Sequence, residues 1–561
     1  MDLYSPRPPR MHKSRARCPP FVPFRDLREY LEALREKELL WTIDKPIKKE
    51  TELFPLVRLQ FRGLPEEQRR AFLFTNVHGA DGRRYEAAVC TGVLAASTEI
   101  YAAGMGCKPS EITGKFIQGL QHPIPPKLVA SGSVQEVVTE GKNLDSGGLA
   151  DIPFPVELPG YSCQVRTTTA FVTKDVETGI QNAGTYSGQV FGPRKILWEI
   201  HRGSDGYNHL RKAAQAGAEL DAAIVVGGAP YVQYTAATKI PYGVDEFAVA
   251  GGIAGEPIKV VRARTVDLLV PADAEYVIEG KISIRDAELQ PPFGEYTGYM
   301  AVGIESQLCP VMTVTAITHR RSPVFQTIIS QMPPSESSKL RQVAYESALT
   351  RHLRDNCNLP GVRRVSFYET SGSWQYCVIQ LKKAKPTDGV QALTAAASYA
   401  ADIGKIFVAV DEDIDPSDPD SVTWAMSFRM QPARDIEIIR GKAAHLDPSA
   451  APPGPQGLET GFREASAVLI DATMKYPYPP VALPKKEFME RAAEIWKSSG
   501  LPDLQLKEPW FGYDLGYWNE DYERQAKLVL SGKHYELGKE LERKRTELKL
   551  NLGKDRGSEA H

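Results

Sequence analysis

The chain has 561 residues, with 68 Lys and Arg against 70 Asp and Glu and a formal net charge of -2 at pH 7. At roughly 150 residues per domain this length predicts about three to four domains, and the composition, 42% hydrophobic and 25% charged, is that of an ordinary globular protein. The near-balance of charge argues against a basic nucleic-acid-binding surface, so we expect no nucleic-acid partner.

The seven cysteines are scattered along the chain, and no Cys-x-x-Cys pair occurs among them. This usage argues against a zinc ribbon and against a disulfide framework, and it favours a reducing, cytoplasmic location. No run of about 18 apolar residues is present, so we expect no membrane span. Residues 1–20 are basic and Pro-rich without an apolar stretch, which predicts a flexible arm and not a secretory signal.

Residues 21–130 are predicted to form an N-terminal α/β domain. Their first structured stretch, FRDLREYLEALREKELLWTI, carries apolar residues at the spacing of one helical face. These residues are Leu27, Tyr30, Leu31 and Leu34. The sequence after this predicted helix mixes short apolar runs with Gly-rich turns, as alternating strands and helices do.

Residues 131–330 have a different pattern, with many short β-like runs such as AAIVVGG, IKVVRAR and CPVMTVTAITHR. Gly and Pro separate these runs at short intervals. The pattern predicts a β-rich domain, a barrel or split barrel, and not a doubly wound sheet.

Helical and strand-like stretches alternate again over residues 331–510, which predicts a second α/β domain and places the whole chain in the α/β (α+β) class. Residues 511–561 hold the charged segment YELGKELERKRTELKL, a predicted helix with few apolar anchors. Two interpretations of this helical tail stay open: a solvated helix, or a clasp between subunits.

Three segments together supply the donors of a metal site. QNAGTYSGQV (181–190) carries an Asn in a Gly-flanked strand-like run, HRGSDGYNH (201–209) begins with a His, and GVDEFAVAG (243–251) carries acids. An amide oxygen, an imidazole and a carboxylate suit Mn²⁺, Mg²⁺ or a similar cation better than a metal that prefers thiolates. Each residue by itself is more often structural, since a His commonly serves as a hydrogen-bond partner.

The segment ELQPPFGEYTGYM places Glu295 between Gly294 and Tyr296. A carboxyl group beside Phe293, Tyr296 and Tyr299 would be partly removed from water, which favours its protonated form and suits a proton donor. The alternative is an ordinary, solvated loop acid.

Lys475 lies in DATMKYPYPP, directly after the apolar run AVLIDA. A compact cation at that point would be able to hold a phosphate oxygen. The alternative is a surface lysine without a function.

Taken in order, these stretches resemble the UbiD family of prenylated-FMN-dependent decarboxylases and carboxylases over roughly residues 22–510. The motifs that carry the resemblance are FRDLREYLEAL, NAGTY, HRG, PYGVDEFAVAGG, VPADAEYVIEG, PPFGEYTGY, WAMSFRMQPARD and IDATMKYP. Several independent motifs in one order make it specific. The resemblance implies a prenylated-FMN-binding split β-barrel over 131–330, an oligomerisation domain over 331–510 and a helical tail over 511–561.

The resemblance also implies a cofactor and metal site. Asn182, His201 and Glu246 would bind a divalent metal, Mn²⁺ first with Fe²⁺ or Mg²⁺ as alternatives, which bridges to the cofactor phosphate with K⁺ nearby. The His201 match requires a short gap in the alignment. Lys475 would approach the phosphate, and Glu295 would be the proton donor. The further cofactor-binding residues that it implies are Gly184, Thr185, Thr238 and Pro241.

Two positions assigned to the catalytic site depart from the family pattern. Ser187 stands where the family has an Arg five residues after the metal-binding Asn, and Gln290 stands where it has a Glu five residues before the donor. In the family these side chains form an ion pair beside the flavin, and loss of one alone would leave a buried unpaired charge at a cost of about 3–5 kcal/mol. Loss of both leaves two neutral groups, so the double change indicates a coherent redesign.

The resemblance implies a non-oxidative carboxy-lyase for an aromatic acid or its CoA thioester. Phthaloyl-CoA decarboxylases are one such class, because a remote CoA handle can position the ring where the Arg is absent. No side chain is a good electron sink, so prenylated FMN would carry the electrons. A prenyl-flavin synthase would supply this cofactor, and we expect a homo-oligomer, a dimer or hexamer. Two alternatives stay open: carboxylation of a phenolic or aromatic substrate, and a flavin-binding non-catalytic subunit of a carboxylase complex.

Overall fold

The computed structural model describes residues 23–161, 166–200, 203–301, 308–443, 447–450 and 465–548. Contacts divide the chain into two compact units: unit 1 is Met1–Glu412 with Gln431–Ala472, and unit 2 is Asp413–Met430 with Thr473–His561. The expected domain boundaries near residues 20, 130, 330 and 510 stay predictions, and the expected N-terminal arm lies outside the described residues.

Unit 1 begins with the amphipathic helix that its sequence predicts. α1 (Leu27–Glu36) is capped by Asp26, whose side chain accepts a hydrogen bond from the backbone N–H of Glu29 at 2.9 Å. All four predicted apolar residues are buried. A four-stranded sheet follows, in the order β1 (Leu40–Ile43), β3 (Ala71–Phe74), β5 (Ala88–Thr91) and β18 (Val324–Gln326).

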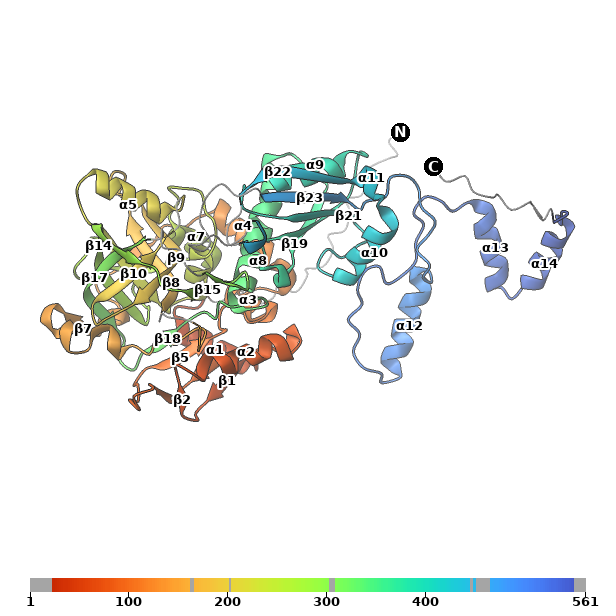
Figure 1. Ribbon diagram of the computed structural model, residues 1–561. Coiled ribbons are helices and arrows are strands. Elements are labelled where there is room, and N and C mark those ends of the chain that lie inside the picture. Colours follow the sequence, from red (N-terminus) through yellow and green to blue (C-terminus); the bar gives the residue numbers. More distant parts are fainter. Residues whose placement is uncertain are drawn as a thin grey trace, which may run out of the picture. The chain divides into compact units, whose positions relative to one another are not determined.

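Six strands of unit 1 close into a barrel (Figure 1). In order around the barrel they are β10 (Lys195–Glu199), β9 (Gln181–Val190), β8 (Arg166–Lys174), β11 (Leu220–Val226), β14 (Tyr276–Leu289) and β17 (Leu308–His319). β10 pairs with β17 to close the ring, with Leu197 opposite Val311. Closure leaves no free edge between these strands, and the predicted barrel is confirmed. β7 (Val137–Glu140) adds one more strand beside β17.

Three helices lie between the barrel strands in sequence. α5 (Asp205–Gln215) follows β10, while α6 (Pro230–Ala236) and α7 (Glu246–Ala254) follow β11. α7 crosses α4 (Ile112–Gln121) very closely, because a Cβ on Gly119 would lie 2.5 Å from Cγ1 of Ile253. A glycine at this crossing therefore lets the two helices touch and helps to fix the position of α7.

A second sheet of unit 1 has a separate core. Its strand order is β19 (Val362–Phe367), β20 (Tyr376–Leu381), β21 (Ile406–Asp411), β23 (Ala465–Asp471) and β22 (Ile436–Lys442). β20, β21 and β23 run parallel, and α8 (Glu336–Arg351) and α9 (Asp388–Ser398) contact this sheet. Parallel strands covered by helices, together with the antiparallel barrel, confirm the α/β (α+β) class.

Unit 1 also contains further α-helices and strands. They are β2 (Ile47–Lys48), α2 (Leu53–Gly63), β4 (Val77–His78), α3 (Thr98–Met105), β6 (Lys127–Leu128), β12 (Lys259–Arg262), β13 (Leu269–Pro271), β15 (Phe293–Gly294), β16 (Met300–Ala301) and α11 (Pro432–Asp435).

Unit 2 contains α10 (Pro419–Arg429), α12 (Lys486–Ser498), α13 (Glu520–Leu530) and α14 (His534–Arg543). It contains a buried, bidentate ion pair between Arg429 and Asp413, with N–O distances of 2.7 and 2.5 Å. By contrast, α12, α13 and α14 bury no residue. Within the described part of the chain, no helix is both long and apolar enough to cross a membrane.

Substitution of Gly119 tests the close helix crossing. We expect Gly119→Ala to lower the free energy of unfolding by about 1–3 kcal/mol, because the added Cβ overpacks the contact with Ile253. Gly114→Ala is the matched control on α4, since a Cβ there meets nothing within 4 Å; it should be neutral or stabilising because Ala is the better helix former. Chemical denaturation measures both variants, and equal stabilities would contradict this packing.

Candidate functional site

Two of the predicted metal ligands meet at the junction of β9 and α7. Asn182 is the second residue of β9, and Glu246 is the first residue of α7. The Asn182 side-chain amide donates to Oε1 of Glu246 at 3.0 Å, and the backbone N–H of Ala183 donates to Oε2 at 2.8 Å. Both side chains are buried. Residues that lie 64 positions apart in sequence are therefore brought into direct contact.

The environment of Glu246 is unusual for a carboxylate. Burial raises the pKa of Glu246 to about 7, although hydrogen bonds from Ala183 and Asn182 oppose this effect. A buried acid that titrates near neutral pH can release its proton when a cation arrives. Such a carboxylate fits the chemistry of the predicted metal ligand.

Tyr186 supports Asn182 from the same face of β9. Residues four apart in a strand lie on one face, and the Tyr186 hydroxyl donates to Oδ1 of Asn182 at 3.2 Å. The same hydroxyl accepts a hydrogen bond from the backbone N–H of Gly206, at the start of α5, at 3.1 Å. Tyr186 was not singled out from the sequence, although the two-residue period of NAGTY places it beside Asn182.

A cavity of about 220 Å³ adjoins Asn182, and its lining includes Asp175, His209 and Tyr242. The His209 Nδ1 atom lies 2.9 Å from Oγ1 of Thr173. Burial lowers the pKa of His209 to about 4, so this imidazole is neutral at pH 7. His209 ends the HRGSDGYNH segment and is a satisfied, structural histidine.

The third predicted ligand, His201, lies outside the described residues, and its role stays a prediction. Within the described ranges, no three or more His, Cys, Asp and Glu side chains gather as a metal-binding group. The predicted set is of another kind, because it combines an amide, a carboxylate and a histidine that the structure does not describe.

The predicted cofactor-binding residues occupy both faces of β9 and the end of α6. Thr185 lies on the face opposite Asn182, and its Oγ1 accepts a hydrogen bond from Nε2 of Gln233 in α6 at 3.4 Å. Just beyond α6, the Thr238 hydroxyl donates to the backbone oxygen of Tyr234 at 2.7 Å. Gly184 has no room for a side chain, because a Cβ would lie 2.6 Å from the Tyr186 ring, whereas Pro241 is exposed.

The two residues that depart from the family pattern are both neutral and differently placed. Ser187 lies in β9, opposite Thr168 of β8 and Glu199 of β10. Gln290 directly follows β14 and is 9% exposed. Neither polar atom of its amide has a hydrogen-bond partner among the described residues. Each such buried, unpaired group costs about 1–3 kcal/mol.

Glu295 lies in the turn that joins β15 to β16. Its backbone N–H donates to the oxygen of Tyr299 at 3.1 Å, and its own carboxylate accepts from the backbone N–H of Tyr296 at 3.3 Å. The side chain is half-buried. Of the three aromatic residues expected near this carboxyl, Phe293 and Tyr296 are buried, whereas Tyr299 is 65% exposed.

Lys475 belongs to unit 2, and its ammonium donates to the backbone oxygen of Thr473 at 2.8 Å. Its predicted contact with a cofactor phosphate is not tested by this placement and stays a prediction.

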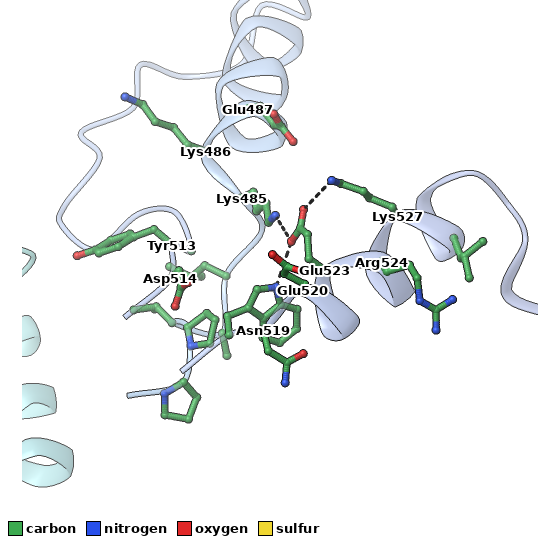
Figure 2. A pocket seen from close by; sticks show the side chains of 18 of the residues that line it. Lys485, Lys486, Glu487, Tyr513, Asp514, Asn519, Glu520, Glu523, Arg524 and Lys527 are labelled. Atoms are coloured by element: carbon green, nitrogen blue, oxygen red, sulfur yellow. Dashed lines mark hydrogen bonds and ion pairs between the residues drawn. The ribbon is translucent and has the colours of Figure 1, made fainter. Parts of the chain in front are cut away.

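A larger hollow, of about 1370 Å³, lies within unit 2 and holds none of the predicted site residues. Figure 2 shows the carboxylate of Glu523 between the ammonium groups of Lys485 and Lys527. The N–O distances are 2.7 Å to Lys485 and 3.7 Å to Lys527. The charged side chains that line this hollow thus pair with one another. Size alone would select this hollow, but the donor chemistry selects the smaller cavity beside Asn182.

Two family models match consecutive parts of the chain. The family model of the 3-octaprenyl-4-hydroxybenzoate carboxy-lyase Rift-related domain, UbiD, matches residues 127–333, and that of the C-terminal domain matches residues 339–472. The uncharacterized protein sll0936 of Synechocystis sp. is 30% identical over 528 residues, which cover 88% of this chain and 100% of that protein.

Solved structures resemble the chain over most of its length. The UbiD-class enzyme HmfF from Pelotomaculum thermopropionicum, in complex with FMN, is 28% identical with a TM-score of 0.72, covering 83% of this chain and 99% of its own. An evolved dimeric form of HmfF in complex with prFMN is also 28% identical, with a TM-score of 0.69, covering 80% of this chain and 95% of its own.

The Tyr186 hydroxyl offers a test of how the site is held together. We expect Tyr186→Phe to lower the free energy of unfolding by about 1–3 kcal/mol, because Asn182 and the N–H of Gly206 both lose a hydrogen bond. Tyr207→Phe is the control, since no hydrogen bond of the Tyr207 hydroxyl occurs among the described residues. Thermal or denaturant unfolding of the two variants gives the comparison. A Tyr186→Phe protein as stable as the control would show that this hydroxyl does not support the site.

Proposed function

Because the chain belongs to the UbiD family of carboxy-lyases, we propose that it removes carbon dioxide from an aromatic carboxylic acid or its CoA thioester with prenylated FMN. The observation that carries this proposal is the contact between Asn182 and Glu246 at the edge of the barrel. The UbiD-class enzyme HmfF, which resembles the chain over most of its length, binds prFMN and FMN.

The residues at this junction fit a divalent cation. The carboxylate of Glu246 and the amide oxygen of Asn182 are hard donors that suit Mn²⁺ first, with Fe²⁺ or Mg²⁺ as alternatives. His201 would be the third ligand, Lys475 would hold the cofactor phosphate, and a K⁺ ion would lie nearby. Tyr186 would keep the amide of Asn182 in the orientation that binding requires.

When bound, prenylated FMN supplies the electron sink that decarboxylation requires. The chain's own contribution to the chemistry is a proton. Glu295 would hold that proton on its carboxyl group and deliver it to the carbon that carried the carboxylate. Its place supports this role, because the carboxylate is half-buried and tied to the backbone of its own turn. Gly294 keeps the turn close to Leu158, whose Cδ1 would lie 1.9 Å from an added Cβ.

The neutral pair of Ser187 and Gln290 supports a CoA thioester as substrate, with phthaloyl-CoA as the specific candidate. A large handle that binds elsewhere can position the ring without the family's Arg. The rates at which the protein decarboxylates phthaloyl-CoA and free aromatic acids test this substrate assignment. Faster turnover of the free acids would rule out phthaloyl-CoA as the substrate. The same residues would serve carboxylation, because the two directions share one transition state.

A flavin-binding subunit without activity is the second candidate function. The neutral Ser187 and Gln290 are the observation that favours it, since they replace two charged groups of the family's site. The presence of Glu295 in its turn favours an active enzyme. Measured decarboxylation by the purified chain would eliminate this candidate.

We also propose a homo-oligomer, a dimer or hexamer, whose cofactor comes from a prenyl-flavin synthase. Helices shorter than about 12–15 residues are marginal by themselves in water, and α13 and α14 bury no residue. On α13, the apolar residues Tyr522, Val529 and Leu530 are 42%, 49% and 63% exposed. Contact with a second subunit would cover them, which favours the clasp over the solvated helix.

Loss of the Glu246 carboxylate tests the metal and cofactor assignment. In native mass spectra of protein made together with a prenyl-flavin synthase, the wild type should carry a divalent metal and a flavin. Glu246→Gln should lose both, because the hard donor that anchors the metal is gone. The exposed Glu256, just beyond α7, provides the control Glu256→Gln, which should keep both masses. The same spectra report the number of subunits.

Metal uptake by the metal-free protein should also depend on pH. The pKa of Glu246 is about 7, so the carboxylate is mostly protonated below that pH and must lose its proton to bind a cation. Affinity should therefore rise as pH increases toward 7 and then level off.

For the variant test, retention of both the metal and the flavin by Glu246→Gln would show that the ligand assignment is wrong.

Substitution of Glu295 tests the proton donor. We expect Glu295→Gln to keep the flavin and the metal but to lose decarboxylation by at least about 100-fold, the contribution typical of a positioned general acid. Glu288→Gln is the matched control, because this exposed acid of β14 pairs with Lys195 at the surface. Carbon dioxide release by the loaded proteins is the measurement. Full activity of Glu295→Gln would assign the proton to another group.

A further inference from the structure

Tyr296, the residue after the proposed proton donor, contacts two other segments of unit 1. The ring of Tyr296 has the guanidinium of Arg341 3.8 Å from its centroid, and the ring of Trp374 5.6 Å away. Tyr296 and Trp374 are each 3% exposed. Gly372, with φ +71°, lies against the same residue, where a Cβ would come within 3.6 Å of the Tyr296 oxygen. The turn that carries Glu295 is thus fixed to α8 and to the segment before β20.

Arg341 is a half-buried cation whose one polar partner among the described residues is a tyrosine. It forms no ion pair with any Asp or Glu that the structure describes, and its polar partner is Tyr345, one turn further along α8. Burial lowers the pKa of Arg341, but the nearby Tyr296, Tyr345 and Glu295 together raise it above the usual value. The side chain therefore stays charged.

The guanidinium carbon of Arg341 lies 3.8 Å from the centroid of the Tyr296 ring. A guanidinium that lies over an aromatic ring uses its flat face, whereas its five N–H groups lie in the plane of the group. That planar fork matches the two oxygens of a carboxylate. A cation that is partly removed from water and forms no ion pair among the described residues gains from a ligand that supplies an anion.

We propose that Arg341 binds the carboxylate group of the substrate beside Glu295 and thereby determines specificity for an aromatic acid anion. This inference rests on the proposed function, in which Glu295 protonates the carbon that carried that carboxylate. The leaving group and the donor must then lie close together, and Arg341 is a cation near the donor turn. It would supply from α8 the positive charge that Ser187 does not supply from β9.

The inference also explains why two neutral residues are tolerated at the family's ion-pair positions. Ser187 and Gln290 cannot attract a carboxylate by charge, so an enzyme for carboxylate substrates needs its cation elsewhere. Arg341 supplies that cation from α8, beside Tyr296 of the donor turn. A substrate with a bulky group toward β9 would then fit without displacing a charged side chain.

Binding of a matched pair of probes tests this role without turnover. Benzoate and benzamide have nearly the same shape, but only benzoate is an anion. Their dissociation constants would be measured on the full-length, flavin-loaded protein by calorimetry or by the fluorescence of the tryptophans, which include Trp374 beside Tyr296. The wild type should prefer benzoate. In Arg341→Gln this preference should fall by about 10- to 100-fold, as expected for the loss of a charge-assisted pair, while benzamide binds as before.

Two further variants complete the test. Arg351→Gln, at the far end of α8, is the control and should keep the wild-type preference. If Arg341→Gln fails to fold, Arg341→Lys decides, because a lysine keeps the charge but loses the planar fork. A reduced preference in Arg341→Lys supports the inference. The inference is overturned if the wild type shows no preference for benzoate. It is also overturned if the preference is unchanged in Arg341→Gln or, where that variant fails to fold, in Arg341→Lys.

The outcome is separable from that for the proposed function. Lost carboxylate preference in a protein that never releases carbon dioxide would leave the Arg341 assignment standing and remove the enzyme assignment. Normal preference in Arg341→Gln, together with lost turnover in Glu295→Gln, would do the reverse.

Discussion

A single buried carboxylate joins the barrel to the helix beside it. Glu246 accepts hydrogen bonds from the side chain of Asn182 and from the backbone of Ala183, so the start of α7 is tied to the start of β9. A buried acid is costly while it is ionised, and its pKa of about 7 reflects that cost. A bound cation would offset this cost, so under the proposed function the junction would serve as a metal site as well as a structural contact.

Much of the fold around the contact between Asn182 and Glu246 could be predicted from the sequence. The spacing of Leu27, Tyr30 and Leu31 predicts α1 because an amphipathic helix must bury one face. Short apolar runs separated by Gly and Pro predict the barrel because closed antiparallel strands need frequent turns. The contact between Asn182 and Glu246 was expected only through the family resemblance, since no local pattern links residues on different elements.

Other features depend on tertiary contacts that sequence patterns do not encode. Tyr186 could have been found from its two-residue period with Asn182, but its second bond, to Gly206, requires the position of α5. The exposure of Tyr299 follows from the direction of its turn, which the composition of ELQPPFGEYTGYM does not determine. Arg341 could not be linked to Glu295 in advance, because 46 residues and several strands separate them. Its partner is an aromatic face and not an acid, so charge pairing gave no signal.

The two ends of the proposed site rest on different physics. At the proposed metal site, the oxygen donors of Asn182 and Glu246 would bind a cation. At the donor turn, the guanidinium of Arg341 lies 3.8 Å from the centroid of the Tyr296 ring and would bind an anion. Ser187 and Gln290, at the positions of the family's ion pair, carry no charge. Under the proposals, the charged groups of this chain's site would be Glu246 at the metal and Glu295 and Arg341 at the donor turn.

The location of the metal tests this arrangement most directly. Crystals of the flavin-loaded, manganese-loaded protein, measured on both sides of the manganese absorption edge, would give an anomalous difference map. We expect one strong peak within bonding distance of the Asn182 amide oxygen, the Glu246 carboxylate and His201, next to the flavin phosphate. A peak elsewhere in a protein that holds the flavin, or flavin bound with no peak at Glu246, would contradict it.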